Sequence, residues 1–117
     1  MFDRTIALKA ISVRVVRLAR AMPASAEGHA LRAELERLGL SLSKNYIKFI
    51  RARREQDHPG SIAHAGKCLT DLTEVSSWLE VIAQANLGWG TRIAPIQTRC
   101  QRLIDSFTAI RTEPRNP

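Results

Sequence analysis

The sequence predicts an all-α protein, folded as an antiparallel up-down-up-down four-helix bundle. Four long segments place apolar residues at alternating steps of three and four, which is the period of one helix face. Three short breaks, each containing Pro or Gly, separate these segments, and short connections favour antiparallel neighbours. Aromatic residues make up only 5% of the 117 residues, which suits helix interfaces better than β-sandwiches.

The first helix is expected over residues 2–22 and the second over residues 27–54. Met22-Pro23 ends the first helix, because the residue before proline is disfavoured in the α region. The second helix begins between Ser25 and Gly28. The apolar seams of the two helices are Leu8, Ile11, Val15, Leu18 and Met22, and then Leu31, Leu35, Leu38, Leu42, Asn45 and Phe49.

The third helix is expected over residues 61–85 and the fourth over residues 92–111. A turn at 56–60 precedes the third helix, with Ser61 as its cap, and a second break at 86–90 precedes the fourth, with Thr91 as its cap. Pro95 falls near the first turn of the fourth helix, where it does least harm. Residues 1–112 therefore form one domain, and residues 113–117 form a flexible tail.

The chain is strongly basic, with a net charge of +7 and a pI near 10.4. No apolar run approaches the ~20 residues that span a bilayer, and the N-terminus lacks the basic leader of a signal peptide. These features indicate a cytoplasmic protein that does not enter a membrane. A basic protein in that compartment most commonly meets nucleic acid, although charge also serves solubility alone.

The predicted nucleic-acid site lies on the second helix. Three of its basic residues recur at i, i+4 and i+7, two more follow at the helix end, and arginines of the first helix assist them. The dipole at a helix C-terminus also favours cations, but it does not require five of them in eleven residues. Tyr46 lies among them and would stack on a base if it were exposed. The predicted site residues are Lys44, Lys48, Arg51, Arg53, Arg54, Arg14 and Arg17.

No catalytic residue, metal site, cofactor or small-molecule substrate is predicted. The sequence contains no phosphate-cradling glycine loop and no Glu-x-x-His pair, and Cys68 and Cys100 match no metal spacing. Ser41 and Cys68 have no identifiable base beside them, so we expect no enzyme. Asn45 interrupts an apolar seam one turn after Ser41. Both residues belong either to a buried polar network that sets register or to a hydrated seam edge.

Acidic residues gather on the third helix, where Asp71, Glu74 and Glu80 are expected to form a solvated or interface-facing polar face. The two tryptophans stand at the edge of the apolar seams. Trp89 is expected to cover the end of the bundle, and Trp78 to lie at the core edge or in a subunit contact.

Parts of the second and third helices resemble the bacterial four-helix bundle family. This family includes proteins encoded in intervening sequences of ribosomal RNA genes and the accessory variability proteins of diversity-generating retroelements. The resemblance covers residues 2–110, and the retroelement branch is the more similar around residues 77–80. The matching positions are Met22-Pro23, Leu31, Glu34, Arg37, Ser41-Leu42, Asn45 and the block Ala65–Leu72.

This sequence departs from the family pattern at several of those positions. The family's Asn-Ile-Ala-Glu-Gly stands here as residues 45–49, Asn-Tyr-Ile-Lys-Phe, so an acid has become Lys48. Glu34 replaces a Gln, Cys68 a Ser and Asp71 a Glu. The chain is therefore similar to a divergent member of the family.

The resemblance implies a homopentameric barrel of basic four-helix bundles. In the retroelement branch such barrels bind RNA or DNA and partner with a reverse transcriptase. Our leading hypothesis is a non-enzymatic scaffold that binds nucleic acid by neutralising phosphates with little base readout. The alternative is a protein-interaction or assembly module whose basic face meets an acidic partner.

Overall fold

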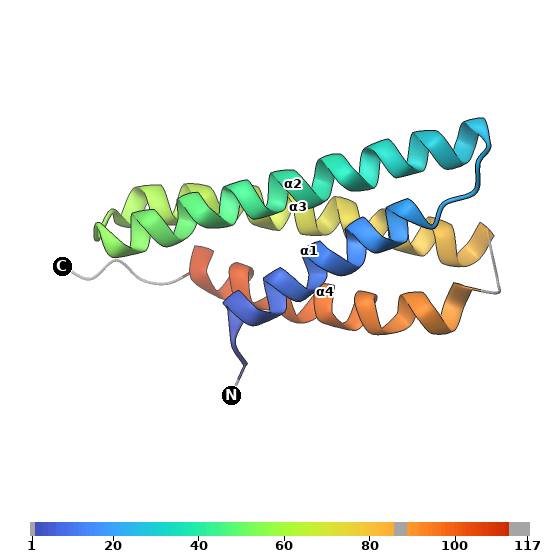
Figure 1. Cartoon of the computed structure of the whole chain (residues 1–117). Helices are drawn as coiled ribbons and strands as arrows, with labels where there is room; N and C mark the ends of the chain where they lie inside the picture. The colour runs from blue at the N-terminus through green and yellow to red at the C-terminus, as the bar shows by residue number, and fades with distance from the viewer. Residues whose placement is uncertain (1, 86–88, 113–117) are drawn as a thin grey trace.

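The computed structural model describes residues 2–85 and 89–112, and within them it contains four helices and no strand. The helices are α1 (Arg4–Arg20), α2 (Ala26–Arg54), α3 (His58–Ala85) and α4 (Gly90–Arg111). The chain runs back and forth along a rod about 53 Å long and 24 by 19 Å across (Figure 1). The all-α, four-helix prediction is therefore confirmed.

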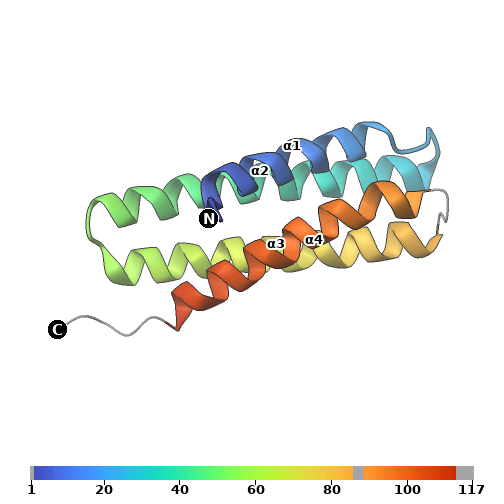
Figure 2. The same ribbon diagram turned by 90° about the horizontal axis from the view of Figure 1, so that it is seen from below.

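The helices form two layers of two, α1 with α2 and α3 with α4 (Figure 2). Each helix packs against its neighbours in sequence, and α1 also packs against α4. Within the described residues the backbones of the diagonal pairs, α1 with α3 and α2 with α4, do not come close together, although aromatic side chains of α2 and α4 meet in the core. Because α2 and α3 have 29 and 28 residues against 17 in α1, their hairpin projects beyond the start of α1 (Figure 1).

The core follows the predicted apolar seams. The first four seam residues of α1 are buried. The three-four spacing of α4 likewise predicts an inward-facing seam of six residues, and all six are buried: Ile93, Ile96, Cys100, Leu103, Phe107 and Ile110. Tyr46, Phe49 and Phe107 make an aromatic cluster at one end of the core, with the Phe49 and Phe107 ring centroids 5.5 Å apart. Trp78 and Trp89 are partly buried and pack against the core.

Side-chain caps fix the starts of α1 and α2. Asp3 accepts a hydrogen bond from the Ile6 N–H, and Ser25 accepts one from the Gly28 N–H. The first helix ends at Arg20, two residues before the predicted end at Met22. Gly28 is required at its position, because a Cβ there would stand 1.8 Å from the Pro23 carbonyl oxygen.

The turn between α2 and α3 is shorter than predicted. The Gln56 N–H donates to the Arg53 carbonyl and the Asp57 N–H to the Ala52 carbonyl, and Gln56 takes the left-handed conformation with φ 56°. Asp57 then accepts the Gly60 N–H with its side chain and the Ser61 N–H with its carbonyl. As a result α3 begins at His58, and Ser61, the predicted cap, is buried inside the helix.

The fourth helix also begins earlier than predicted, at Gly90, with Trp89 in the cap position and no side-chain cap hydrogen bond. Thr91 is therefore inside the helix, as is Pro95. Residues 86–88 of the predicted break and the predicted tail, residues 113–117, lie outside the described residues. No described helix is both long enough and apolar enough to cross a membrane.

Candidate nucleic-acid interface

Basic residues are distributed unevenly among the four helices. The helix α1 carries five basic residues and no acidic one, whereas α3 carries one basic residue and three acidic ones. Since α1 and α3 lie on a diagonal of the bundle, the molecule has a basic side along α1 and an acidic side along α3. The α1 residues are Arg4, Lys9, Arg14, Arg17 and Arg20, and the α3 residues are Lys67, Asp71, Glu74 and Glu80.

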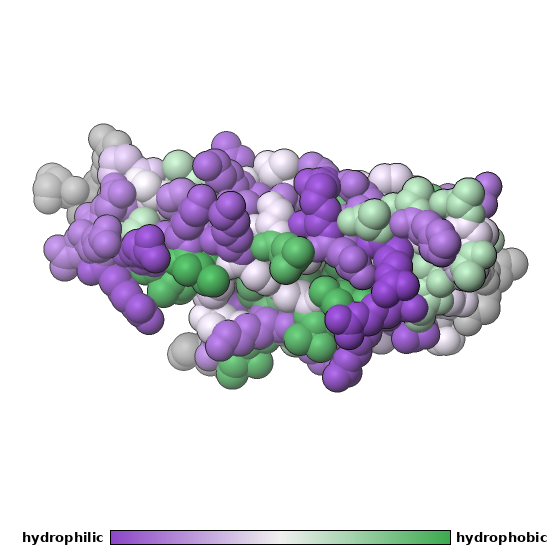
Figure 3. Space-filling model, turned by 45° about the horizontal axis from the view of Figure 1, so that its top comes forward, coloured by the Kyte–Doolittle hydropathy of each residue, from purple (hydrophilic) through white to green (hydrophobic). Residues whose placement is uncertain are grey.

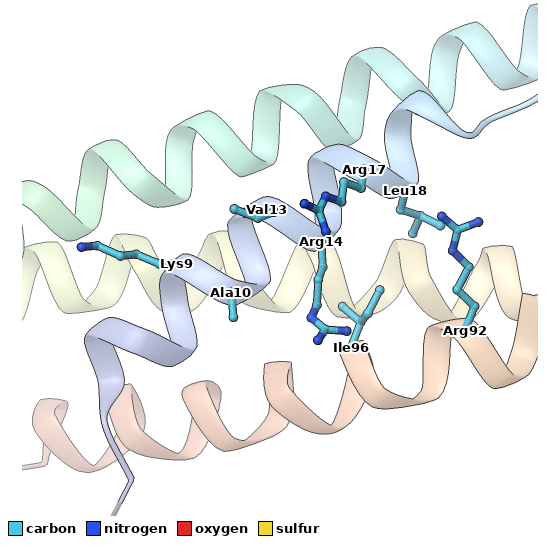
Figure 4. Close-up of a pocket in the computed structure, with 8 residues that line it drawn as sticks. All are labelled: Lys9, Ala10, Val13, Arg14, Arg17, Leu18, Arg92 and Ile96. Atoms are coloured by element: carbon cyan, nitrogen blue, oxygen red, sulfur yellow. The ribbon is translucent and has the colours of Figure 1, made fainter.

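A groove between α1 and α4 lies on the basic side (Figure 4). It has a volume of about 490 Å³. Arg14 extends from α1 toward α4, and Arg92 extends from α4 toward α1 (Figure 4). Four of the eight residues that line the groove are cations, and none of the eight is a carboxylate. The lining consists of Lys9, Ala10, Val13, Arg14, Arg17, Leu18, Arg92 and Ile96.

Local packing positions the groove's arginines. Leu18 and Ile96 are buried and attach the two walls to the core. The Arg92 guanidinium stands over the Trp89 ring, 5.4 Å from its centroid, which restricts the side chain at the mouth of the groove. Three guanidinium groups that share a site without a carboxylate repel one another. An anion that enters relieves this repulsion.

The predicted residues of α2 separate into two groups. Helical spacing places Lys44, Lys48, Arg51 and Arg54 on one side, where Lys48 is half-buried and the other three are exposed. Arg53 lies about 200° around the helix axis from Arg51, and its guanidinium stands over the Phe49 ring, 5.3 Å from the centroid. Arg53 therefore covers the end of the aromatic cluster and does not belong to the basic face of α2.

Two hollows adjoin the outward face of α2. One lies between α1 and α2 and contains Lys9, Arg51 and Arg54 with a single carboxylate, Glu55. In the other, Glu55 and Asp57 offset the charge of Lys48 and Arg51. The second hollow is thus balanced in charge, and the first is basic.

Tyr46 is not available to stack on a base. Its ring is 6% exposed and lies in the aromatic cluster, and its hydroxyl forms a hydrogen bond with the Thr5 hydroxyl. Tyr46 is expected to stack on a base only if it is exposed, and it is not exposed. Through this hydrogen bond, Tyr46 links α2 to α1.

Ser41 and Asn45 meet a carboxylate that sequence reasoning placed on the surface. Asp71 is 7% exposed and accepts hydrogen bonds from Ser41 Oγ at 2.8 Å and Asn45 Nδ2 at 3.0 Å. Of the two alternatives for Asp71, the solvated one is wrong and the interface-facing one holds, because Asp71 shares the inward face with Cys68 and Val75, three residues before it and four after it. Ser41 and Asn45 therefore belong to a hydrogen-bonded network in which Asp71 is buried and the other two residues are half-buried.

Both thiols are buried. Burial, with a contribution from the Asp71 charge, raises the pKa of the Cys68 thiol to about 12, and burial raises the pKa of Cys100 to about 12. Such thiols stay protonated near neutral pH and are poor nucleophiles. No three His, Cys, Asp or Glu side chains of the described residues lie close enough together to hold a metal ion.

The predicted site residues omit Lys9 and Arg92, which the structure places in the α1–α4 groove. Arg92 is separated from Arg14 by 78 positions, so only the packing of α1 against α4 brings them together. The signal that was available is the charge of α1 itself, which has no acidic residue over 17 positions. In comparisons with known proteins, no protein family, curated protein or solved structure matches this chain.

Proposed function

We propose that this protein is a non-enzymatic scaffold that binds RNA or DNA, and that the α1–α4 groove is the centre of the binding surface. The observation that carries the proposal is that Arg14, Arg17 and Arg92 line one groove whose lining contains no carboxylate. Guanidinium groups bind phosphate oxygens bidentately, and a groove between two helices admits an extended backbone.

The proposed mode of binding is sequence-independent. The groove offers cations and aliphatic side chains, and cations bind the phosphates of any sequence. Phosphate contacts of this kind release counterions, so affinity falls steeply with salt. Lys9 lines both the α1–α4 groove and the hollow beside Arg51 and Arg54, and we propose that these two arginines of α2 extend the footprint.

The proposal is tested by fluorescence anisotropy with a labelled 20-nucleotide RNA and a DNA duplex across a salt series. In the variant Arg14→Gln/Arg17→Gln/Arg92→Gln we expect weaker binding. We also expect a shallower salt dependence, by about 0.7–0.9 in the log–log slope for each phosphate that the variant no longer neutralises. All three side chains line a surface groove, so circular dichroism should show an unchanged helical fold.

A matched control removes the same charge elsewhere. Arg32, Lys67 and Arg111 are exposed and line none of the grooves described above, so Arg32→Gln/Lys67→Gln/Arg111→Gln should retain the wild-type slope. Equal losses of affinity in the two triple variants would show that net charge alone attracts the nucleic acid. Absence of wild-type binding at low salt would refute the function itself.

The family resemblance extends the proposal to assembly and partner. We propose a cytoplasmic homopentamer that acts as an accessory to a reverse transcriptase. Five copies of a +7 chain would carry about +35, which strengthens attraction for polyanions. Light scattering would give about 65 kDa for the pentamer against 13.1 kDa for a single chain, and a 13.1 kDa species alone would exclude it.

A further inference from the structure

Large apolar side chains are exposed on the outward ridges of α1 and α2. Among the described residues, five such side chains are at least 49% exposed, and four of them belong to these two adjacent helices. They are Ile6 at 68%, Val13 at 49%, Leu40 at 72% and Ile47 at 60%. Figure 3 shows this face, with apolar patches between strongly hydrophilic side chains. Phosphates gain nothing from such side chains, so the nucleic-acid proposal leaves them unexplained.

The four side chains have helical spacing. Ile6 and Val13 are seven residues apart, as are Leu40 and Ile47, which places each pair on one side of its helix, about 10.5 Å apart along the axis. The two helices are held side by side by the Ser43–Ser12 hydrogen bond of 3.1 Å and by the Tyr46–Thr5 contact. The groove between α1 and α2 contains at one end a hollow of about 510 Å³, which Ile47 and Ile50 line.

Cations surround this apolar surface. Lys9 lies between the two apolar residues of α1, and Lys44 lies between those of α2. The hollow at one end adds Arg51 and Arg54 against the single carboxylate of Glu55. The complementary ligand is an amphipathic segment with apolar residues on one side and carboxylates on both flanks.

We propose that the α1–α2 face docks an acidic amphipathic helix of a partner protein. Apolar residues of that helix at i, i+3 or i+4, and i+7 span the same length of about 10.5 Å as the ridges. Its flanking Asp and Glu residues meet Lys9, Lys44 and Arg51. This interaction shares Lys9 and Arg51 with the proposed nucleic-acid surface, but it uses the exposed apolar side chains and so goes beyond nucleic-acid binding.

A second copy of the chain fits this face poorly. A two-fold contact would place the lysines of one copy against the same lysines of the other, and a head-to-tail contact, as in a cyclic pentamer, needs an acidic face elsewhere on the chain. The acidic helix α3 is no better complement, since two of its three carboxylates are engaged. Asp71 is bonded to Ser41 and Asn45, and Glu74 accepts from Arg37 at 3.1 Å. A different protein therefore supplies the carboxylates.

The test uses two labelled synthetic helical peptides of one composition and equal length. The first places Leu residues at i, i+4, i+7 and i+11 between Glu residues, and the second scrambles the order so that the Leu residues share no face. We expect the full chain to bind the first peptide at least about tenfold more tightly than the second.

The variant Leu40→Gln/Ile47→Gln should lose at least about tenfold in affinity for the first peptide. Val81→Gln on α3, 50% exposed in the wild type, is the matched control and should bind normally.

Equal binding of the two peptides, or unchanged binding by the Leu40→Gln/Ile47→Gln variant, would overturn the proposal. A lower molecular mass of the Leu40→Gln/Ile47→Gln variant in light scattering would also overturn it, because the face would then be a contact between copies. Loss of RNA binding by the same variant would overturn it as well. The nucleic-acid proposal is judged separately on Arg14→Gln/Arg17→Gln/Arg92→Gln, which should keep its affinity for the first peptide.

Discussion

Asp71 is a buried carboxylate held by two neutral donors, so its removal should leave both donors unsatisfied. In Asp71→Ala, Ser41 Oγ and Asn45 Nδ2 lose their shared acceptor between α2 and α3. We expect the free energy of unfolding to fall by about 1–3 kcal/mol, measured by urea denaturation. The exposed Glu80 on the same helix is the control, and Glu80→Ala should change stability by less than about 0.5 kcal/mol. Equal stability of the two variants would mean that water replaces the carboxylate without cost.

The two thiols allow a test of burial at single residues. Burial raises the pKa of Cys68 and Cys100 from the usual 9.0 to about 12, so the folded protein holds about a thousandth of the ordinary thiolate fraction at pH 8. We expect reaction with a thiol-specific reagent to be slowed by at least that factor relative to the unfolded chain. Because the folded pKa is raised, the neutral thiols favour the folded state below about pH 9, and this contribution falls as the pH rises toward 12. Rapid labelling of either cysteine under native conditions would show that its helix opens.

At the scale of single residues, sequence spacing identified Ser41 and Asn45 but not their acceptor. Asn45 was visible because it interrupts a run of large apolar residues. The sequence predicts Asp71 on one polar face with Glu74 and Glu80, because the spacing of Leu69 and Leu72 indicates a different inward face for α3. The seam through Cys68 and Val75, which are both fully buried, would have included it.

Replacing glycine by alanine is expected to change the free energy of unfolding in opposite directions at two helical positions. Nothing lies within 4 Å of a Cβ added at Gly66 in the middle of α3, so Gly66→Ala should raise the free energy of unfolding by about 0.5–1 kcal/mol through helix propensity. In Gly28→Ala the new Cβ would stand 1.8 Å from the Pro23 carbonyl oxygen, which requires the α1–α2 connection to move. We expect that variant to be less stable than the wild type in the same urea titration. A stabilised Gly28→Ala would mean that this connection is loose.

At the scale of elements, the apolar periodicity predicts the four helices. It does not predict where they begin and end, because the ends depend on local hydrogen bonds. The Pro59-Gly60 pair indicates a loop by composition. Asp57 nevertheless caps this segment with both its side chain and its carbonyl, and Pro59 is favourable in a first turn, so the helix starts at His58. Gln56 takes the left-handed conformation that glycine usually supplies, which allows the turn to close one residue before Asp57.

At the scale of the whole molecule, the basic groove depends on packing rather than on any local pattern. The helix spacing of Lys44, Lys48 and Arg51 correctly placed them on one exposed side of α2, yet Arg53 turns toward Phe49 and leaves that side. The α1–α4 groove combines residues from opposite ends of the sequence. It becomes recognisable only once α1 is known to pack on α4 rather than on α3.

The four lysines of the chain offer a direct test of which side of the molecule meets nucleic acid. Lys9 lies on α1, Lys44 and Lys48 on α2, and Lys67 on the acidic helix α3. If phosphates occupy the α1–α4 groove, RNA should slow modification of Lys9 by an amine-reactive reagent and leave Lys67 unchanged, as measured by mass spectrometry of digested protein. Because Lys9 also lines the hollow beside Arg51, protection of Lys48 together with Lys9 would extend the footprint onto α2. Equal protection of Lys9 and Lys67 would mean that RNA surrounds the bundle without preference, and the charge difference between α1 and α3 would then have no role in orienting it.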